Sequence, residues 1–248
     1  QWGGLRFQSG SRGSLSYCTV EYATYSTGYG VYANQPSSLT LDHCTLQNNS
    51  YGFYGDNAQP TLTNNTFQNN SYGLYFQNTS APNVNFGAGN LISNNTSGGI
   101  YYKGCSNIGT IQNLTLQNNA GYGAFRFENS GDFTLGSNTI TDNSWPLTID
   151  AGSFPASGSN IPTSGNTNNA IRVTSSTSSK SGTWNKFDVN YIVTETPTVG
   201  SGQTLTIAAG DTVKFDGNRS LNVNGTLNAS GTSGFSHRPC VLKNFLRL

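Results

Sequence analysis

Short runs of alternating apolar and polar residues, separated by Asn, Gly and Ser, cover most of this chain. Gly4–Phe7, Leu39–Leu41, Gly99–Tyr102 and Phe133–Leu135 are of this kind. An alternation with a period of two residues predicts β-strands, and the residues between the runs favour turns. Since no window keeps apolar residues at helical spacing for long, the pattern predicts almost no helix.

The strand pattern is repeated. The stretch Leu46–Tyr54 returns almost unchanged as Phe67–Tyr75, and weaker copies begin at Ile92, Leu116 and Ile140. One asparagine position is shared by all the copies: Asn49, Asn70, Asn95, Asn119 and Asn143, at intervals of 21, 25, 24 and 24 residues. A period in the twenties indicates stacked supersecondary units. Short strands with Asn in register fit the coils of a parallel solenoid better than a β-sandwich.

Stacking places equivalent residues of successive coils directly above one another, about 4.8 Å apart. An Asn amide both donates and accepts hydrogen bonds, so an Asn column can satisfy itself, and Asn also tolerates a left-handed turn conformation. The same alignment predicts an apolar column inside the coil: Val20, Leu46, Phe67, Ile92, Leu116 and Ile140.

These features resemble the right-handed parallel β-helix repeat proteins, the pectate-lyase-like superfamily and its secreted bacterial and archaeal surface relatives. The resemblance rests on Trp2–Phe7, Leu15–Ala23 and the Asn-Asn turns, and it spans roughly residues 1–175. It implies an all-β, right-handed parallel β-helix, and the repeat length predicts about eight to ten coils. Residues 205–227 resemble the rung that usually opens such solenoids, yet here they come last.

We therefore divide the chain into regular coils (1–150), a long loop with one coil (151–185), less regular coils (186–232) and an atypical tail (233–248). The inverted order indicates a piece of a longer tandem array, with frayed ends, or molecules that stack head to tail through exposed strand edges. The absence of Met and of a signal-peptide pattern also indicates a processed product or a fragment. The tail could be a cap, a docking peptide or a cloning remnant.

The amino-acid composition limits the kinds of partner and the cellular location that we expect for this protein. Charged residues are only 9% of the chain, against about 25% in an average domain, and this neutral, hydroxyl-rich and amide-rich surface predicts an extracellular or cell-surface location. A net charge of +1 without a basic cluster argues against nucleic acid. No apolar run approaches the ~20 residues of a membrane span. No ligand spacing predicts a metal, and no motif predicts a cofactor.

One outward column of side chains is a candidate binding face. The inward residues of one sheet align as Leu5, Val31, Phe53, Leu74, Ile100, Phe125, Leu147 and Ile171, and the residues that follow them are Arg6, Tyr32, Tyr54, Tyr75, Tyr101, Arg126, Thr148 and Arg172. Four successive tyrosines would form an exposed stripe about 15 Å long, suited to stacking on a glycan or another polymer. The alternative is a cross-strand ladder that only stabilises the sheet.

Two positions further along each strand lie candidate catalytic residues. Glu128 and Asp150 are expected on adjacent coils, about 5 Å apart at the backbone, beside Arg126 and Lys103. Such a pair could serve a retaining glycosidase, or one carboxylate could abstract a proton in a lyase. A charge cluster neutralised by its neighbours is the alternative.

The catalytic motifs of the resembling family argue against an enzyme. The polygalacturonase-like Asn-Thr-Asp, Asp-Asp, Gly-His-Gly and Arg-Ile-Lys motifs are absent, and the calcium-binding aspartates of pectate lyases have no counterpart. The prediction is therefore a non-catalytic structural or adhesive solenoid whose partner is a glycan, a polymer or, end to end, a second copy. A polysaccharide lyase or glycoside hydrolase is the alternative.

Cys18 and Cys44 take the same place in consecutive repeats. Backbones about 4.8 Å apart lie within disulfide range, so an inter-coil disulfide and two buried free thiols are both open. Cys105 and Cys240 have no predictable partners.

Overall fold

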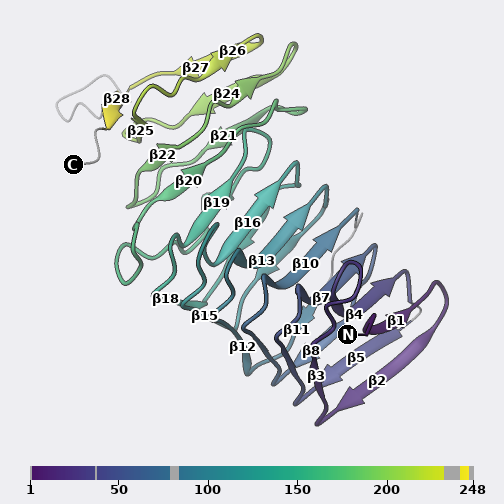
Figure 1. Ribbon diagram of the computed structural model, residues 1–248. Helices are drawn as coiled ribbons and strands as arrows, with labels where there is room; N and C mark the ends of the chain where they lie inside the picture. Colours follow the sequence, from purple (N-terminus) through teal and green to yellow (C-terminus); the bar gives the residue numbers. More distant parts are fainter. Residues whose placement is uncertain (1, 37, 79–83, 232–240, 246–248) are drawn as a thin grey trace.

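The computed structural model describes residues 2–36, 38–78, 84–231 and 241–245 as a stack of parallel β-coils (Figure 1). All regular elements among these residues are strands. The described part of the chain contains no helix that could span a membrane. The coils make about nine turns, within the range expected from the repeat length.

The longest sheet, which we call the long sheet, has eleven strands. They are β1 (Leu5–Phe7), β4 (Tyr29–Asn34), β7 (Tyr51–Asp56), β10 (Tyr72–Gln77), β13 (Gly98–Lys103), β16 (Phe125–Glu128), β19 (Leu147–Ile149), β20 (Ile171–Val173), β22 (Tyr191–Val193), β25 (Thr212–Asp216) and β28 (Val241–Phe245). A second sheet contains β3 (Thr19–Glu21), β6 (Thr45–Gln47), β9 (Thr66–Gln68), β12 (Asn90–Ser93), β15 (Leu114–Gln117) and β18 (Thr139–Thr141).

Four smaller sheets complete the coils. They are β2 (Arg12–Ser16) with β5 (Ser38–Asp42), β8 (Thr61–Thr63) and β11 (Asn85–Phe86); β14 (Gly109–Ile111) with β17 (Phe133–Leu135); β21 (Gly182–Trp184) with β24 (Thr204–Ile207) and β27 (Thr226–Ala229); and β23 (Thr198–Val199) with β26 (Asn222–Val223). Of the predicted atypical tail, only β28 lies within the described residues.

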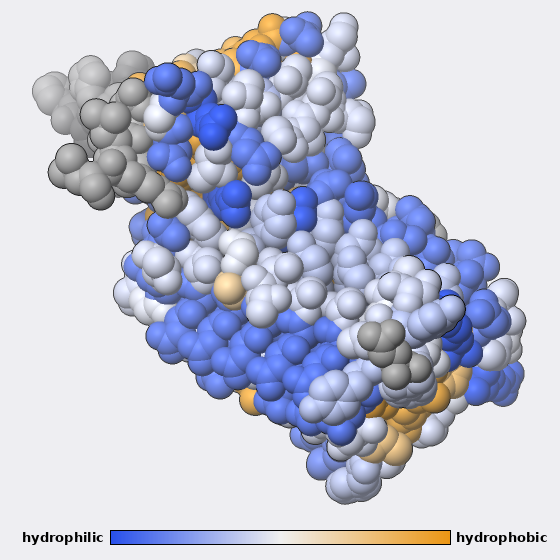
Figure 2. Space-filling model, in the orientation of Figure 1, coloured by the Kyte–Doolittle hydropathy of each residue, from blue (hydrophilic) through white to orange (hydrophobic). Residues whose placement is uncertain are grey.

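The predicted register of both main sheets is confirmed. The long sheet pairs Leu5 with Val31 and continues through Phe53, Leu74, Ile100, Phe125, Leu147 and Ile171. The second sheet stacks the apolar column from Val20 to Ile140, and every member is buried. Outside this column, the second sheet carries rows of Thr and Gln, and Figure 2 shows a hydrophilic band along the flank where β12, β15 and β18 lie.

The Asn column forms a buried ladder that links coil to coil. The Asn70 N–H donates to Asn95 Oδ1 (3.0 Å), and Asn95 Nδ2 donates to Phe67 O (3.1 Å) and to Asn119 Oδ1 (2.9 Å). The same bonds recur along the column, which Asn166 extends by one coil. A second ladder, which the sequence did not predict, joins Asn65 to Asn90 at another corner.

The left-handed turn does not fall on the ladder residue. It falls on the residue before it, since Asn48, Asn69, Asn94, Asn118 and Asp142 have φ of 56°, 55°, 56°, 54° and 58°. One Asn per coil was expected both to adopt the left-handed conformation and to bond the next coil, whereas in the structure two consecutive residues share these roles. The first residue of each Asn-Asn pair turns the chain, and the second one bonds the coils.

The described cysteines are free thiols. Of the two alternatives for Cys18 and Cys44, the inter-coil disulfide is not formed, and the alternative of two buried free thiols holds for Cys44 but is wrong for Cys18, which is exposed. Cys105 is buried. Cys240 lies outside the described residues.

Candidate functional site: an outer tyrosine face

The outer side of the long sheet carries the predicted column and a second row of tyrosines beside it. Tyr32, Tyr54, Tyr75, Tyr101 and Arg126 pair in register on successive strands. Three residues earlier in the strands, Tyr29, Tyr51 and Tyr72 also pair in register. We call the seven tyrosines of the two rows the tyrosine face.

Glycine brings the second row onto the same side. In a strictly alternating strand, residues three apart point to opposite faces, yet the rings of Tyr51 and Tyr54 touch, with centroids 5.4 Å apart. The residue after Tyr51 is Gly52, where a Cβ would lie 2.6 Å from Gly73 O and 3.0 Å from Asn70 Nδ2. The strand thus departs from alternation beside the Asn ladder, where only glycine fits.

The predicted exposed stripe is wrong for most of its residues. Tyr54, Tyr75 and Tyr101 are only 8%, 7% and 5% exposed, and Tyr32 is half-buried. They are covered because the second row folds over them, with ring centroids 4.3 Å apart for Tyr29 and Tyr54, 5.4 Å for Tyr51 and Tyr75, and 5.4 Å for Tyr72 and Tyr101. The half-buried rings of Tyr29, Tyr51 and Tyr72 are therefore the solvent side of the face. The repeated Tyr-Gly-x-Tyr motif was the signal for this second row.

Burial further favours the neutral form of five tyrosine hydroxyls of the face. It raises the pKa of Tyr51, Tyr54, Tyr72, Tyr75 and Tyr101 above the ordinary value for tyrosine. All five hydroxyls are neutral near pH 7 and can donate or accept a hydrogen bond. These five tyrosines thus form an uncharged array of rings and hydroxyls.

A cluster of three charged side chains, Lys103, Arg126 and Glu128, lies at one end of the tyrosine face. Glu128 accepts a short hydrogen bond from the Tyr101 hydroxyl and forms ion pairs with Arg126 (2.8 Å) and Lys103 (3.3 Å). Arg126 also donates to the Tyr72 hydroxyl (3.2 Å), and its guanidinium lies over the rings of Tyr101 and Tyr122, 4.2 Å and 3.6 Å from their centroids.

The same cluster determines the ionisation of Glu128. Burial alone would raise the pKa of this carboxyl, but the Tyr101 hydroxyl, Arg126 and Lys103 outweigh it and lower the pKa. Glu128 is therefore ionised at neutral pH and cannot donate a proton as a general acid.

Asp150 does not join Glu128 on the surface, contrary to the sequence prediction. It is fully buried, and its carboxylate accepts hydrogen bonds from Asn129 N (2.8 Å), Gly152 N (3.0 Å) and Ser153 Oγ (2.7 Å). The bonds from Gly152 and Ser153 shape the turn after β19, because an aspartate oxygen readily accepts from nearby groups of the chain, and the bond from Asn129 links this turn to the preceding coil. Glu128 and Asp150 thus do not form the carboxylate pair of a glycosidase.

Residues 3–244 match the sequence model of a family described as "Right handed beta helix region". The chain belongs to this family. No curated protein and no solved structure matches it.

In this β-helix, arginines flank the tyrosine face at both ends. Arg6 lies over the rings of Tyr29 and Tyr32, 5.8 Å and 5.5 Å from their centroids. Arg172, two coils beyond Arg126, lies 5.1 Å from the Tyr122 centroid and pairs with Glu195 at 3.6 Å. No group of three or more potential metal-ligating side chains occurs in the described part of the chain.

Proposed function

We propose that this β-helix is a non-catalytic, extracellular or cell-surface module whose tyrosine face contacts a glycan chain. The observation that carries the proposal is the double row of tyrosines outside the solenoid. These rings add nothing to the interior, and Tyr29, Tyr51 and Tyr72 keep part of their surface open to solvent. A tyrosine ring offers a flat apolar surface and a polar hydroxyl, which suits the apolar face and the hydroxyl groups of a sugar.

The geometry favours an extended chain that runs along the solenoid axis. The centroids of the outer rings are 5.4 Å apart for Tyr29 and Tyr51 and 5.8 Å for Tyr51 and Tyr72. The inner row holds the outer rings in place, so that binding would freeze few side-chain rotations. Arg6 and Arg126 at the two ends supply hydrogen-bond donors.

Substituting the outer rings tests the proposal. Each aromatic stacking contact contributes about 0.5–1.5 kcal/mol, so the double variant Tyr51→Ala with Tyr72→Ala should weaken binding about fivefold or more. Affinity electrophoresis and titration against a panel of soluble neutral and acidic polysaccharides would measure the loss. The matched control is Tyr17→Ala, which removes a ring that is 77% exposed and lies off the tyrosine face. Equal affinities of the double variant and the wild type would refute the proposal.

A further inference from the structure

The wall of the β-helix that contains β14 and β17 is interrupted after β17. The sheet of β14 and β17 ends at β17, and a separate sheet starts at β21. The segment 154–163 lies between them and contributes only an isolated bridge, from Pro155 to Phe133. On its other side, Asn185 Nδ2 donates to Pro155 O (2.9 Å).

The interruption is a bulge of two residues. Ala156 N–H donates to Phe133 O (2.8 Å), and Asn160 N–H donates to Leu135 O (2.6 Å). The acceptors are two residues apart, and the donors are four apart, although a regular parallel ladder would keep the two spacings equal. Two extra residues are therefore pushed out of the wall, and Ser159 N–H closes the turn by donating to Ala156 O (2.9 Å). Bulges of this kind often lie beside functional sites.

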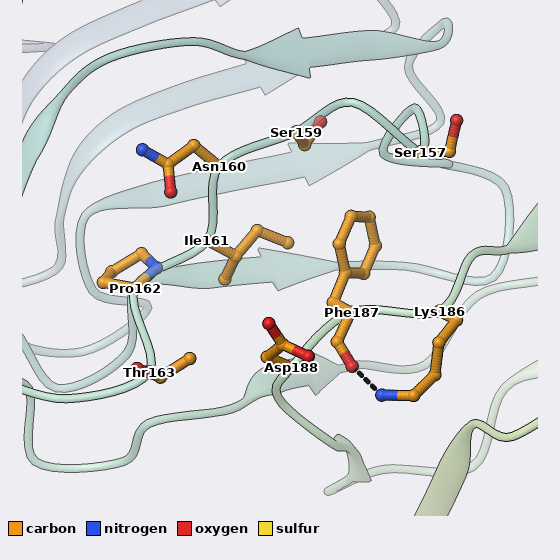
Figure 3. A pocket seen from close by; sticks show the side chains of 9 residues that line it. All are labelled: Ser157, Ser159, Asn160, Ile161, Pro162, Thr163, Lys186, Phe187 and Asp188. Carbon is orange, nitrogen blue, oxygen red and sulfur yellow. Dashed lines mark hydrogen bonds between the residues drawn. The ribbon is translucent and has the colours of Figure 1, made fainter.

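The bulge forms one side of a pocket of about 400 Å³ (Figure 3), within the range of small-molecule sites. It is lined by Ser157, Ser159, Asn160, Ile161, Pro162, Thr163, Lys186, Phe187 and Asp188. The buried side chains of Ile161 and Phe187 supply apolar surface, whereas Ser157, Asn160, Thr163 and Asp188 are exposed at the rim.

The charges at the rim define the class of ligand. Lys186 and Asp188 flank Phe187 on the same segment, and in Figure 3 the carboxylate of Asp188 points toward Ile161, while the Lys186 ammonium bonds to Phe187 O. A cationic ligand would be repelled by the Lys186 ammonium, and an anionic ligand would be repelled by the Asp188 carboxylate. A neutral ligand therefore fits best. Carboxylate, amide and hydroxyl groups around apolar surface suit a molecule with several hydroxyls and an apolar face.

We propose that this pocket binds one unit of a neutral sugar, with Asp188 and Asn160 accepting and donating hydrogen bonds to its hydroxyls and Ile161 and Phe187 against its ring. A second hollow of about 320 Å³, lined by Asn113, Thr115, Asn138 and Thr139 among others, shares Asn160 with the pocket. The site thus has room for a neighbouring sugar of the same chain. It is separate from the tyrosine face and does not depend on the function proposed for that face.

Amide chemical-shift titration of the full chain with glucose, galactose, mannose and N-acetylglucosamine tests this site. We expect saturable shifts of residues 157–163 and 186–188 with at least one of the four sugars. The Asp188→Asn variant should bind that sugar at least tenfold more weakly. The matched control is Asp142→Asn, because Asp142 is an exposed carboxylate at a corner where other coils carry Asn.

Three results would overturn the inference: no saturable shift with any of the four sugars, an Asp188→Asn titration equal to that of the wild type, or tighter binding of acetate or ethanolamine than of every sugar. The double variant Tyr51→Ala with Tyr72→Ala should keep the pocket shifts. Failure of the tyrosine-face proposal and failure of this inference are therefore distinguishable.

Discussion

The Asn ladder makes the most direct prediction about stability. Truncating Asn95 to Ala removes the acceptor of the Asn70 N–H, a backbone group in the interior. Phe67 O loses its bond from Asn95 Nδ2 but remains paired in the ladder between β9 and β12. The substitution also removes the side-chain hydrogen bonds of Asn95 with Asn70 and Asn119. These two residues are not orphaned, because Asn70 Nδ2 still donates to Leu46 O and Asn119 Oδ1 still accepts from the backbone N–H of residue 95. An orphaned buried group costs about 1–3 kcal/mol. The orphaned Asn70 N–H therefore predicts a loss of about 1–3 kcal/mol in the free energy of unfolding.

Urea denaturation followed by circular dichroism and by tryptophan fluorescence would measure this loss. The matched control is the neighbouring Asn94→Gly, because Asn94 has φ of 56° and makes none of the inter-coil ladder bonds. Glycine tolerates that conformation, so the control should change stability by less than about 1 kcal/mol. The division of tasks between the two asparagines is refuted if the control costs as much as Asn95→Ala, or if Asn95→Ala costs less than about 1 kcal/mol.

Two further predictions concern ionisation. Burial raises the pKa of Asp211 to about 6 from the ordinary 3.8, so the folded state binds this proton more tightly than the unfolded state, and stability falls as the pH rises from about 4 to 6. Asp211→Asn should gain on the order of 2 kcal/mol at pH 7 and converge with the wild type below pH 4 in urea titrations; parallel profiles would contradict this. For Glu128 the sign is opposite: its pKa is lowered, so its stabilisation is present above the ordinary pKa of 4.5 and is lost as the pH falls through the folded value. Glu128→Gln should therefore be less stable than the wild type at pH 7, and the gap should narrow on acidification; a gap that does not change with pH would argue against the ion pairs.

The strand register was predictable from the sequence because residues one repeat apart in a solenoid lie directly above one another on adjacent strands. Once Leu46–Tyr54 and Phe67–Tyr75 are superposed, residues that match in the repeat must lie on adjacent strands. Burial on the outer side was not predictable in this way. It depends on Gly52 and its equivalents, which let Tyr51 return to the side of Tyr54, and alternation alone places those residues on opposite faces.

The buried position of Asp150 and the bulge could not be predicted from the repeat, because both lie where the repeat ends. Asp150 follows the last clear copy of the repeat, and its carboxylate caps the turn that leaves β19 instead of continuing the outward column. The bulge between Ala156 and Asn160 adds two residues to one coil, and nothing in the polar sequence of this segment marks which residues pair with β17. The register of the regular coils does not hold beyond an insertion, so a period extrapolated across it assigns the wrong pairs of residues.

A comparison of two outer faces on the same coils supports a contact role for the tyrosines. On β6 and β9 the outward residues are Thr45, Gln47, Thr66 and Gln68, and Gln68 Nε2 donates to Gln47 Oε1 (2.9 Å). On β7 and β10 of the same coils, the outer side carries Tyr51, Tyr54, Tyr72 and Tyr75. Both sheets are parallel, although β7 and β10 depart from strict alternation at Gly52 and Gly73, and Thr and Tyr are both favoured in strands. Strand propensity alone therefore does not select tyrosine for one face and hydroxyls and amides for the other. The difference between the two faces of the same coils therefore supports the proposal that the tyrosine face contacts a partner.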